Sequence, residues 1–148
     1  MAKFLYKMQN VLDVKLKLED QAKSAYAEAM MKLNEEEAKL QALFLRKEQY
    51  EEEGRRMRED SINVNDLREN THAIENLKEQ IVLQEEEVRV AEEGVEVANR
   101  LLTKAMQERK TQEKLKENAF EEFKRELNAA ESKEIDELVS YRYGQGKQ

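Results

Sequence analysis

The 148-residue chain contains no cysteine, no proline and no tryptophan, and only one histidine and four glycines. Without cysteine it can form neither a disulfide framework nor a zinc site built on thiolates. A single histidine cannot supply a paired-histidine metal motif. The shortage of proline and glycine disfavours a fold of many short strands and tight turns. These absences favour a chain built from a few long helices.

Charge is abundant and of mixed sign, with 26 lysines and arginines against 33 aspartates and glutamates, a net charge of −7. No apolar run approaches the ~18 residues that a membrane-spanning helix needs, and the N-terminus lacks the apolar stretch of a secretory signal. The basic cluster of Arg55, Arg56 and Arg58 is small for nucleic-acid binding in an acidic chain. We therefore expect a soluble, intracellular protein that neither binds nucleic acid nor spans a membrane.

Apolar residues recur every three or four positions in the first third of the chain, which argues against disorder despite the high charge. The spacing alternates between four and three, except for two successive fours around Ala29, where we expect a local relaxation of the supercoil. Eleven of these fourteen positions are apolar: Phe4, Met8, Val11, Lys15, Leu18, Ala22, Ala25, Ala29, Leu33, Glu36, Leu40, Leu43, Lys47 and Tyr50.

A second apolar stripe begins at Leu67 and keeps the three–four alternation without a break. Such a sustained heptad pattern is typical of a coiled coil. Ten of its twelve positions are apolar: Leu67, Asn70, Ile74, Leu77, Ile81, Gln84, Val88, Ala91, Val95, Ala98, Leu102 and Ala105.

Between the stripes Gly54 is a candidate C-cap, and Asn63 or Asn65 can cap the helix that follows. We expect a single domain over residues 1–148, with one helix over about 3–57, a turn over about 58–64, a second helix over about 65–141 and a frayed tail over 142–148. The fold class is all-α, an antiparallel coiled-coil hairpin. Folding back near residue 61 pairs residue i with about 122 − i, so Phe4 is expected near Asn118.

The second helix is expected to overhang the first by about twenty residues at the open end of the hairpin. An apolar strip without a partner in its own chain usually marks a surface for another protein. The overhang would leave five such residues exposed: Phe120, Phe123, Leu127, Ile135 and Leu138.

The sequence gives no indication of catalysis or of a cofactor. The glutamate triplets lack the desolvated pocket that acid–base chemistry needs, and they read as a solvated helix face. Glu69 and His72 have the spacing of one di-iron motif, but such a site needs two motifs and further carboxylates. We therefore expect neither an enzyme nor a metal or cofactor site.

Three segments, in this order and spacing, resemble the flagellar export protein family FliJ. They are residues 3–12 (KFLYKMQNVL), residues 61–68 (SINVNDLR) with 74–77 (IENL) following, and residues 133–138 (KEIDEL). The resemblance implies an antiparallel two-helix coiled coil similar to the γ subunit of rotary ATPases. It also implies a cytoplasmic protein, peripheral to the inner membrane at the flagellar type III export apparatus. Because the apolar seam closes within one chain, we expect the protein to be monomeric when alone.

The resemblance implies three kinds of partner: the hexameric export ATPase FliI, the export gate protein FlhA, and export chaperones. The open end would enter the ATPase ring and promote its assembly, and the middle of the hairpin would bind the gate. The ATPase-facing candidates are Phe4, Met8, Ile135, Asp136, Glu137 and Leu138. The gate-facing stripe falls on Lys39, Leu43, Arg46, Tyr50, Ala73, Leu77, Gln80 and Gln84, of which Arg46, Ala73 and Gln84 depart from the aromatic residues or histidine of better-known members.

Two other functions are compatible with the composition: a passive coiled-coil scaffold, and a holdase-like chaperone that uses the exposed apolar strip. The unequal lengths of the two helices favour the ATPase stalk and adaptor, because a symmetric scaffold gains nothing from an overhang.

Overall fold

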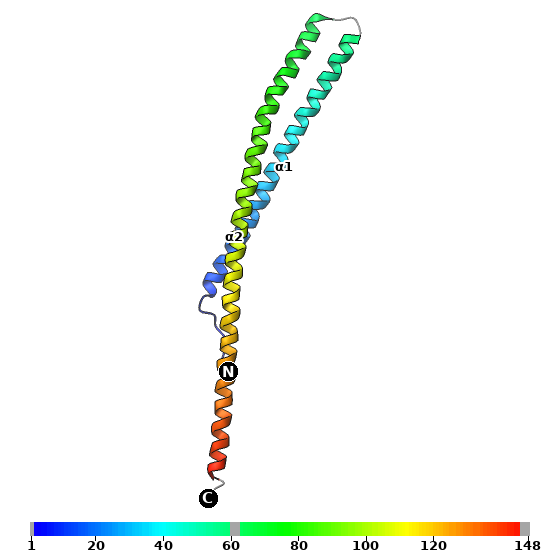
Figure 1. Ribbon diagram of the computed structural model, residues 1–148. Coiled ribbons are helices and arrows are strands. Elements are labelled where there is room, and N and C mark those ends of the chain that lie inside the picture. The colour runs from blue at the N-terminus through cyan, green and yellow to red at the C-terminus, as the bar shows by residue number, and fades with distance from the viewer. Residues whose placement is uncertain (1, 60–62, 146–148) are drawn as a thin grey trace. The chain divides into compact units, whose positions relative to one another are not determined.

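The computed structural model describes residues 2–59 and 63–145, and these form an all-α helical hairpin as expected (Figure 1). The two helices are α1 (Gln9–Glu59, 51 residues) and α2 (Val64–Gln145, 82 residues), and the described residues contain no strand. No helix in this part of the chain has an apolar stretch long enough to cross a bilayer.

The helices differ from the sequence expectation at three of their ends. α1 begins at Gln9 and not near residue 3, and residues 2–6 lie outside the helix. At its start the Gln9 amide donates to the Tyr6 carbonyl, and the amides of Val11 and Leu12 donate to the Met8 carbonyl. α1 also continues through Gly54 to Glu59. α2 includes residues 142–145, which were expected to fray. Part of the expected turn, residues 60–62, and the last three residues of the expected tail lie outside the described residues.

Asn63 caps α2, which resolves the choice between Asn63 and Asn65. Its side-chain Oδ1 accepts hydrogen bonds from the backbone amides of Asn65 at 3.1 Å and Asp66 at 3.5 Å. An N-cap side chain of this kind satisfies donors that have no partner inside the helix. Asp66 lies in the first turn, where its negative charge complements the helix dipole.

The packed residues divide into two compact units. Unit 1 is formed by the described residues up to Asp20 and from Lys104 onward, and unit 2 by residues 21–103. In unit 2, α1 and α2 lie antiparallel, with Glu36 bonded to Gln84 and Tyr50 bonded to Asn70. These pairs agree with the expected pairing of residue i with about 122 − i. The buried apolar residues of unit 2 are Leu77, Ile81, Ala91 and Ala98.

The seam of α1 differs by one residue from the predicted stripe near its start. Glu19 is buried while Leu18 is 43% exposed, and Tyr26 is half-buried while Ala25 is exposed. The packed positions from residue 19 to 36 therefore alternate threes and fours without a slip, and the expected relaxation around Ala29 was wrong. An ion pair across the seam decides this register, because Glu19 has a cationic partner on α2 and Leu18 does not.

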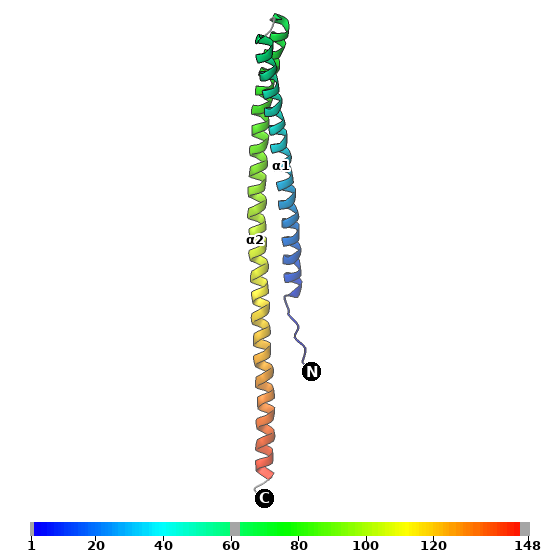
Figure 2. The same cartoon turned by 90° about the vertical axis from the view of Figure 1, so that its right-hand side faces the viewer.

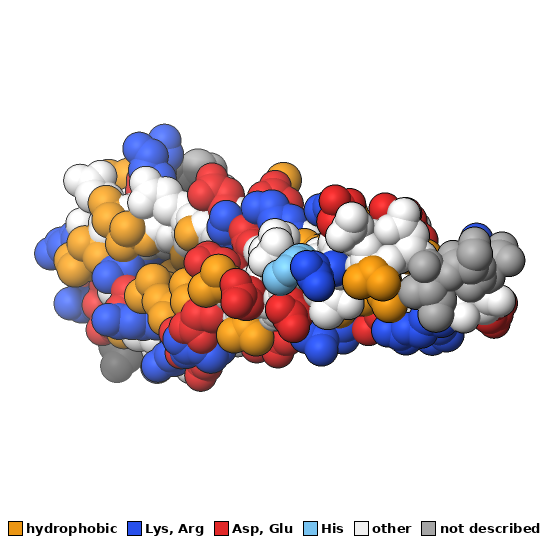
Figure 3. All heavy atoms as spheres, turned by 90° about the horizontal axis from the view of Figure 1, so that it is seen from above, with side chains coloured by type: hydrophobic (Ala, Val, Ile, Leu, Met, Phe, Trp, Pro, Cys, Tyr) orange, Lys and Arg blue, Asp and Glu red, His pale blue; other side chains and the backbone are white. Residues whose placement is uncertain are grey.

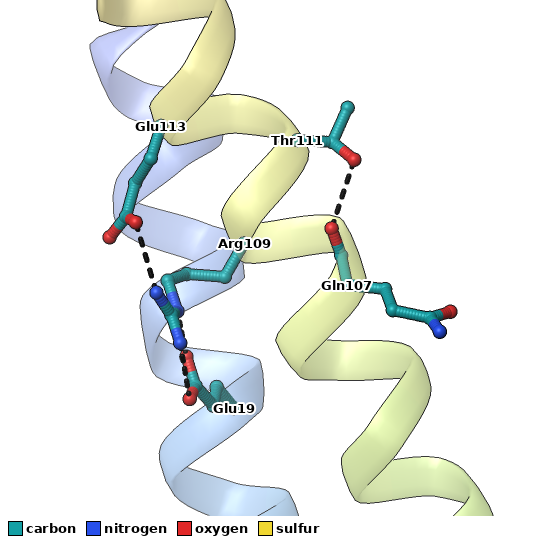
Figure 4. A network of polar contacts seen from close by, with 5 residues as sticks. All are labelled: Glu19, Gln107, Arg109, Thr111 and Glu113. Carbon is teal, nitrogen blue, oxygen red and sulfur yellow. Dashed lines mark hydrogen bonds and ion pairs between the residues drawn. The ribbon is translucent and has the colours of Figure 1, made fainter.

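That cationic partner is Arg109 (Figure 4). Its guanidinium donates to Glu19 through Nε at 2.5 Å and Nη2 at 3.2 Å, and to Glu113 on its own helix at 2.9 Å. The hydrogen bonds to Glu19 and then Glu113 raise the pKa of Arg109. Removing one member of such a pair would leave the other charged group buried without its partner, which is strongly destabilising.

In unit 1 the aromatic residues of the open end pack against one another. Phe4 lies against Phe120, with ring centroids 5.1 Å apart, and against Phe123 at 5.5 Å. The expectation that Phe120 and Phe123 lack a partner within the chain was therefore wrong. Phe4 itself lies against α2 close to the position predicted for it, Asn118. Beyond Leu127, which is half-buried, residues 128–144 are all exposed (Figure 2). The overhang of α2 is confirmed, but it starts later than expected.

Two of the helical glycines, Gly54 and Gly94, provide a matched test of packing. A Cβ at Gly54 would lie 2.6 Å from Oδ1 of Asn70, whereas a Cβ at Gly94 would meet nothing within 4 Å. We expect Gly94→Ala to raise the free energy of unfolding by about 0.5–1 kcal/mol, the usual gain of alanine over glycine inside a helix. At Gly54 the alanine would displace the buried Asn70 amide, and loss of its hydrogen bond should lower the free energy of unfolding by about 1–3 kcal/mol. This cost opposes the gain in helix propensity.

Urea unfolding followed by circular dichroism should therefore show opposite signs for Gly54→Ala and Gly94→Ala. The double variant Gly54→Ala, Asn70→Ala removes the clash together with the amide and should unfold later than Gly54→Ala alone. Equal stabilisation by both single alanine variants would contradict the close approach of Gly54 to Asn70.

Candidate functional site

Two open grooves lie between the helices of unit 2, and they contain most of the predicted gate-facing residues. The first, which we call the Leu43–Leu83 groove, has a volume of about 430 Å³. The second, the Tyr50–Ala73 groove, has a volume of about 420 Å³. The first is lined by Lys39, Ala42, Leu43, Arg46, Gln80, Leu83, Gln84 and Glu87, and the second by Tyr50, Glu53, Met57, Asp66, Glu69, Asn70 and Ala73.

The structure separates the predicted gate-facing residues by accessibility. Arg46 is exposed, while Leu43, Tyr50, Ala73 and Gln84 are half-buried along the groove walls. Leu77 is only 3% exposed and lines neither groove. Leu77 therefore belongs to the seam that supports the grooves, because a side chain so deeply packed offers almost no surface to a partner.

A polar layer forms the base of the Leu43–Leu83 groove. The side-chain amide of Gln84 donates to the Glu36 carboxylate at 2.5 Å and to the Glu36 backbone carbonyl at 3.0 Å. The same carboxylate binds Lys32 at 2.9 Å and Lys39 at 3.2 Å, although its side chain is only 4% exposed. The hydrogen bonds from Lys32 and then Gln84 lower the pKa of Glu36 to about 2.

The buried pair of Glu36 and Gln84 was not predicted from the sequence, although Gln84 was a predicted gate-facing residue. Both interrupt an otherwise apolar stripe, and the expected pairing places residue 36 within about two residues of residue 84. That coincidence was a usable signal for a buried polar layer. A polar pair inside a coiled-coil seam fixes the register of the helices, since any shift leaves buried polar atoms without partners.

A second polar layer stabilises the Tyr50–Ala73 groove. Asn70 is 5% exposed, and its Nδ2 donates a hydrogen bond of 2.8 Å to the backbone carbonyl of Tyr50. Buried Gly54 gives the Asn70 side chain the space that it occupies. Glu69 and His72, whose spacing suggested half of a metal motif, are both exposed. No group of three potential metal ligands gathers among the residues that the structure describes.

The predicted ATPase-facing residues fall into two separate places within unit 1. Phe4 is half-buried against α2, and Met8 nearby is 48% exposed. Ile135 lies twelve residues beyond Phe123, a distance of about 18 Å along a helix that rises 1.5 Å per residue. The exposed residues Ile135, Asp136, Glu137 and Leu138 therefore form one surface and Phe4 belongs to another.

The surface around Phe4 is a groove of about 490 Å³ at the end of α1 in unit 1. The Lys124 ammonium lies 5.0 Å from the ring centre of Phe120, a distance suited to a cation–π interaction. The groove is lined by Lys3, Phe4, Leu5, Tyr6, Lys7, Ala119, Glu122, Phe123 and Glu126.

Acidic and basic side chains are interspersed over the face seen in Figure 3, with apolar side chains between them. Many charged side chains of the described residues pair within one helix, as Arg89 does with Glu86 and Glu93, both at 2.5 Å. Exposed pairs of this kind contribute little to stability, typically about 0–1 kcal/mol each. The exposed apolar residues are therefore the more informative part of this surface.

The depressed pKa of Glu36 predicts a specific acid sensitivity. A carboxylate whose pKa is lowered on folding stabilises the folded state fully when the pH is above the ordinary pKa of 4.5. That contribution is lost as the pH falls from 4.5 toward the folded-state pKa of about 2. We expect the wild-type thermal midpoint to fall more steeply over this window than that of Glu36→Gln. The exposed neighbour variant Glu37→Gln should follow the wild type. Parallel midpoint curves for wild type and Glu36→Gln would show that the polar layer does not hold Glu36 ionised.

Residues 4–148 match the family described as flagellar FliJ protein. No curated protein matches the chain. A solved structure of similar fold is that of CT670 from Chlamydia trachomatis, described as a YscO homologue, with 23% sequence identity, 99% of each chain covered and a TM-score of 0.62.

The family match carries more information than the structural one, because a likeness at 23% identity concerns the fold alone. The FliJ family is part of the flagellar type III export apparatus, in which its members are non-enzymatic coiled-coil components. Since the match covers nearly all of the sequence, the chain belongs to the flagellar FliJ protein family.

Proposed function

We propose that this protein is an adaptor of the flagellar export apparatus that docks into the export ATPase ring and also binds the export gate and export chaperones. The observation that carries the proposal is the apolar surface of α2 beyond Leu127, where α1 provides no cover. Ile135 is 60% exposed, Leu138 is 62% exposed and Val139 is 48% exposed. Leu138 and Val139 follow Ile135 by three and four residues, so both side chains lie next to Ile135 on one helical face.

A single helix is a suitable shape for entering a narrow ring, because its diameter with side chains is about 10–12 Å. One asymmetric helix that meets several identical subunits cannot match each of them closely, so its contacts should be few. Stimulation then comes from binding the assembled ring more tightly than free subunits, which shifts the assembly equilibrium. The protein needs no catalytic group for this function.

The grooves of unit 2 are the proposed gate-binding surface. They combine half-buried apolar walls from Leu43, Tyr50 and Ala73 with the exposed guanidinium of Arg46. An apolar surface bordered by polar groups is typical of interfaces between proteins. The α2 residues of these grooves lie in the N-terminal part of the helix, whereas Ile135 lies near its C-terminal end. The gate and the ATPase would therefore bind different parts of the chain.

The ATPase interaction is tested by Ile135→Ser, Leu138→Ser. Both residues are exposed, so the variant should keep its helicity and its stability. It should lose most of its stimulation of FliI hexamer formation, measured by sedimentation of the ATPase with and without this protein. The matched control is Val64→Ser, Val82→Ser, whose side chains are 62% and 67% exposed outside this surface. A chain truncated after Ala130 should lose the stimulation as well. Full stimulation by the Ile135, Leu138 variant would contradict terminal docking.

The gate interaction is tested by Ala42→Glu, Arg46→Glu, because both residues are exposed and line the Leu43–Leu83 groove. We expect binding to a peptide from the cytoplasmic linker of FlhA to weaken by about 10-fold or more, as expected when an apolar contact and a charge-assisted bond are both lost. FliI stimulation should be retained. Ala38→Glu, Arg68→Glu makes the same chemical changes at exposed positions outside both grooves, and it should bind like the wild type.

Leu77 is unsuited to this test although it was a predicted gate-facing residue. Replacing a leucine that is 3% exposed with alanine is expected to destabilise the fold by about 2–5 kcal/mol. A loss of gate binding in Leu77→Ala would therefore report unfolding of the seam. If Ala42→Glu, Arg46→Glu binds the linker peptide as tightly as its control, the groove is not the gate-binding surface.

A further inference from the structure

Helix α2 carries a second apolar stripe in unit 2 that α1 does not cover. Leu83 and Leu101 are 69% and 57% exposed, and Val90 and Val97 are both 49% exposed. Together with Glu87 and Gly94 they follow the spacing four, three, four, three, four, which is the spacing of a coiled-coil seam. We call these six positions the outer stripe: Leu83, Glu87, Val90, Gly94, Val97 and Leu101.

The outer stripe runs alongside the seam between the helices and not on the opposite side of α2. Leu83 and Glu87 line the Leu43–Leu83 groove together with residues of α1. The pKa of Lys32 on α1 is raised first by its hydrogen bond to Glu36, and Glu87 adds a smaller contribution. The stripe therefore borders α1 at the level of Lys32 and leaves the groove toward Leu101.

Both helices present a small residue one heptad beyond the level of Lys32 and Glu87. On α1 this residue is Ala25, which is exposed, and on α2 it is Gly94, where an added Cβ would meet nothing within 4 Å. Small residues on both helices allow a third backbone to approach closely. Val90 and Val97 lie on α2 on either side of Gly94, where they can pack into the holes of another helix.

Spacing and charge together define the chemistry of the occupant. A three–four repeat matches the side chains of another α-helix, because no other regular element presents residues at that period. Residues 83–101 contain six glutamates and two arginines. Both arginines already pair with glutamates of α2, Arg89 with Glu86 and Glu93, and Arg100 with Glu96. The surroundings of the stripe therefore attract a basic helix, and they disfavour a second copy of this chain, whose own stripe would bring more glutamates.

From these observations we propose that the outer stripe is a docking surface for an amphipathic helix with basic flanks, contributed by another protein. The helix would lie along α2 from Leu83 to Leu101 and complete a three-helix packing with unit 2. The outer stripe shares Leu83 and Glu87 with the groove proposed for the gate and shares no residue with the surface around Ile135. It therefore gives the chain a third place to hold a partner.

A synthetic helical peptide of three heptads, with leucine at its seam positions and lysine on both flanks, is a suitable probe. Its lysines repel one another, so the free peptide should stay monomeric. We expect it to bind the full-length wild-type chain and the Val64→Ser, Val82→Ser control equally. Binding to Val90→Ser, Val97→Ser should be weaker by about 10-fold or more, because these valines would become buried only in the complex. A peptide with glutamate in place of each lysine should bind more weakly than the basic peptide.

Since the chain has no cysteine, the position of the peptide can be mapped by disulfide formation in a buffer of oxidised and reduced glutathione, in which oxidised glutathione is the oxidant. With one cysteine at the centre of the peptide, a disulfide should form readily with Gly94→Cys and poorly with Val82→Cys. Equal binding to the stripe variant and its control, equal binding of the acidic peptide, or no binding of either peptide would overturn the proposal. Sedimentation that showed a wild-type dimer abolished by Val90→Ser, Val97→Ser would overturn it as well, because the occupant would then be a second copy.

Discussion

Two helices that face each other can bury only one narrow stripe each, and the rest of this structure follows from that constraint. Among the described residues the buried apolar side chains are few: Leu12, Leu77, Ile81, Ala91 and Ala98. The remaining apolar residues stay half-buried or exposed, although the chain contains enough of them to form a larger core. A two-helix fold therefore leaves apolar surface that further helices or partner proteins can cover.

The narrow seam also makes its polar positions important. Glu36 with Gln84 and Asn70 with the Tyr50 carbonyl fall within unit 2, while Glu19 with Arg109 falls within unit 1. A seam of alanines and leucines can slide by a heptad with little loss of stability. Each of these buried polar groups, in contrast, bonds to a group at one particular position on the other helix. The polar pairs therefore define the alignment of the helices within each unit, and the apolar residues supply most of the attraction.

Family membership and surface chemistry support each other in the functional interpretation. A member of the FliJ family is expected to act through its surface and not through catalysis. The accessible features are the apolar end of α2, the two grooves of unit 2 and the outer stripe. Each of these surfaces combines exposed apolar residues with nearby charge, which suits protein partners better than small molecules. Apart from Leu83 and Glu87, which the outer stripe shares with the Leu43–Leu83 groove, these surfaces consist of different residues. They can therefore be altered independently by substitutions of exposed side chains that are not shared.

The sequence alone determined the two helices, the reversal between them, the overhang of α2 and the family, because these depend on long periodic patterns and on motifs spread along the chain. It also indicated Asn63 as one of two possible caps. Only the tertiary structure decided between Leu18 and Glu19 in the seam, placed Gly54 inside α1 against Asn70, and brought Phe4 onto Phe120 and Phe123. In a chain rich in alanine and charge, two adjacent stripes of a helix can be almost equally apolar. The residue that can bond to the other helix is then the one that becomes buried.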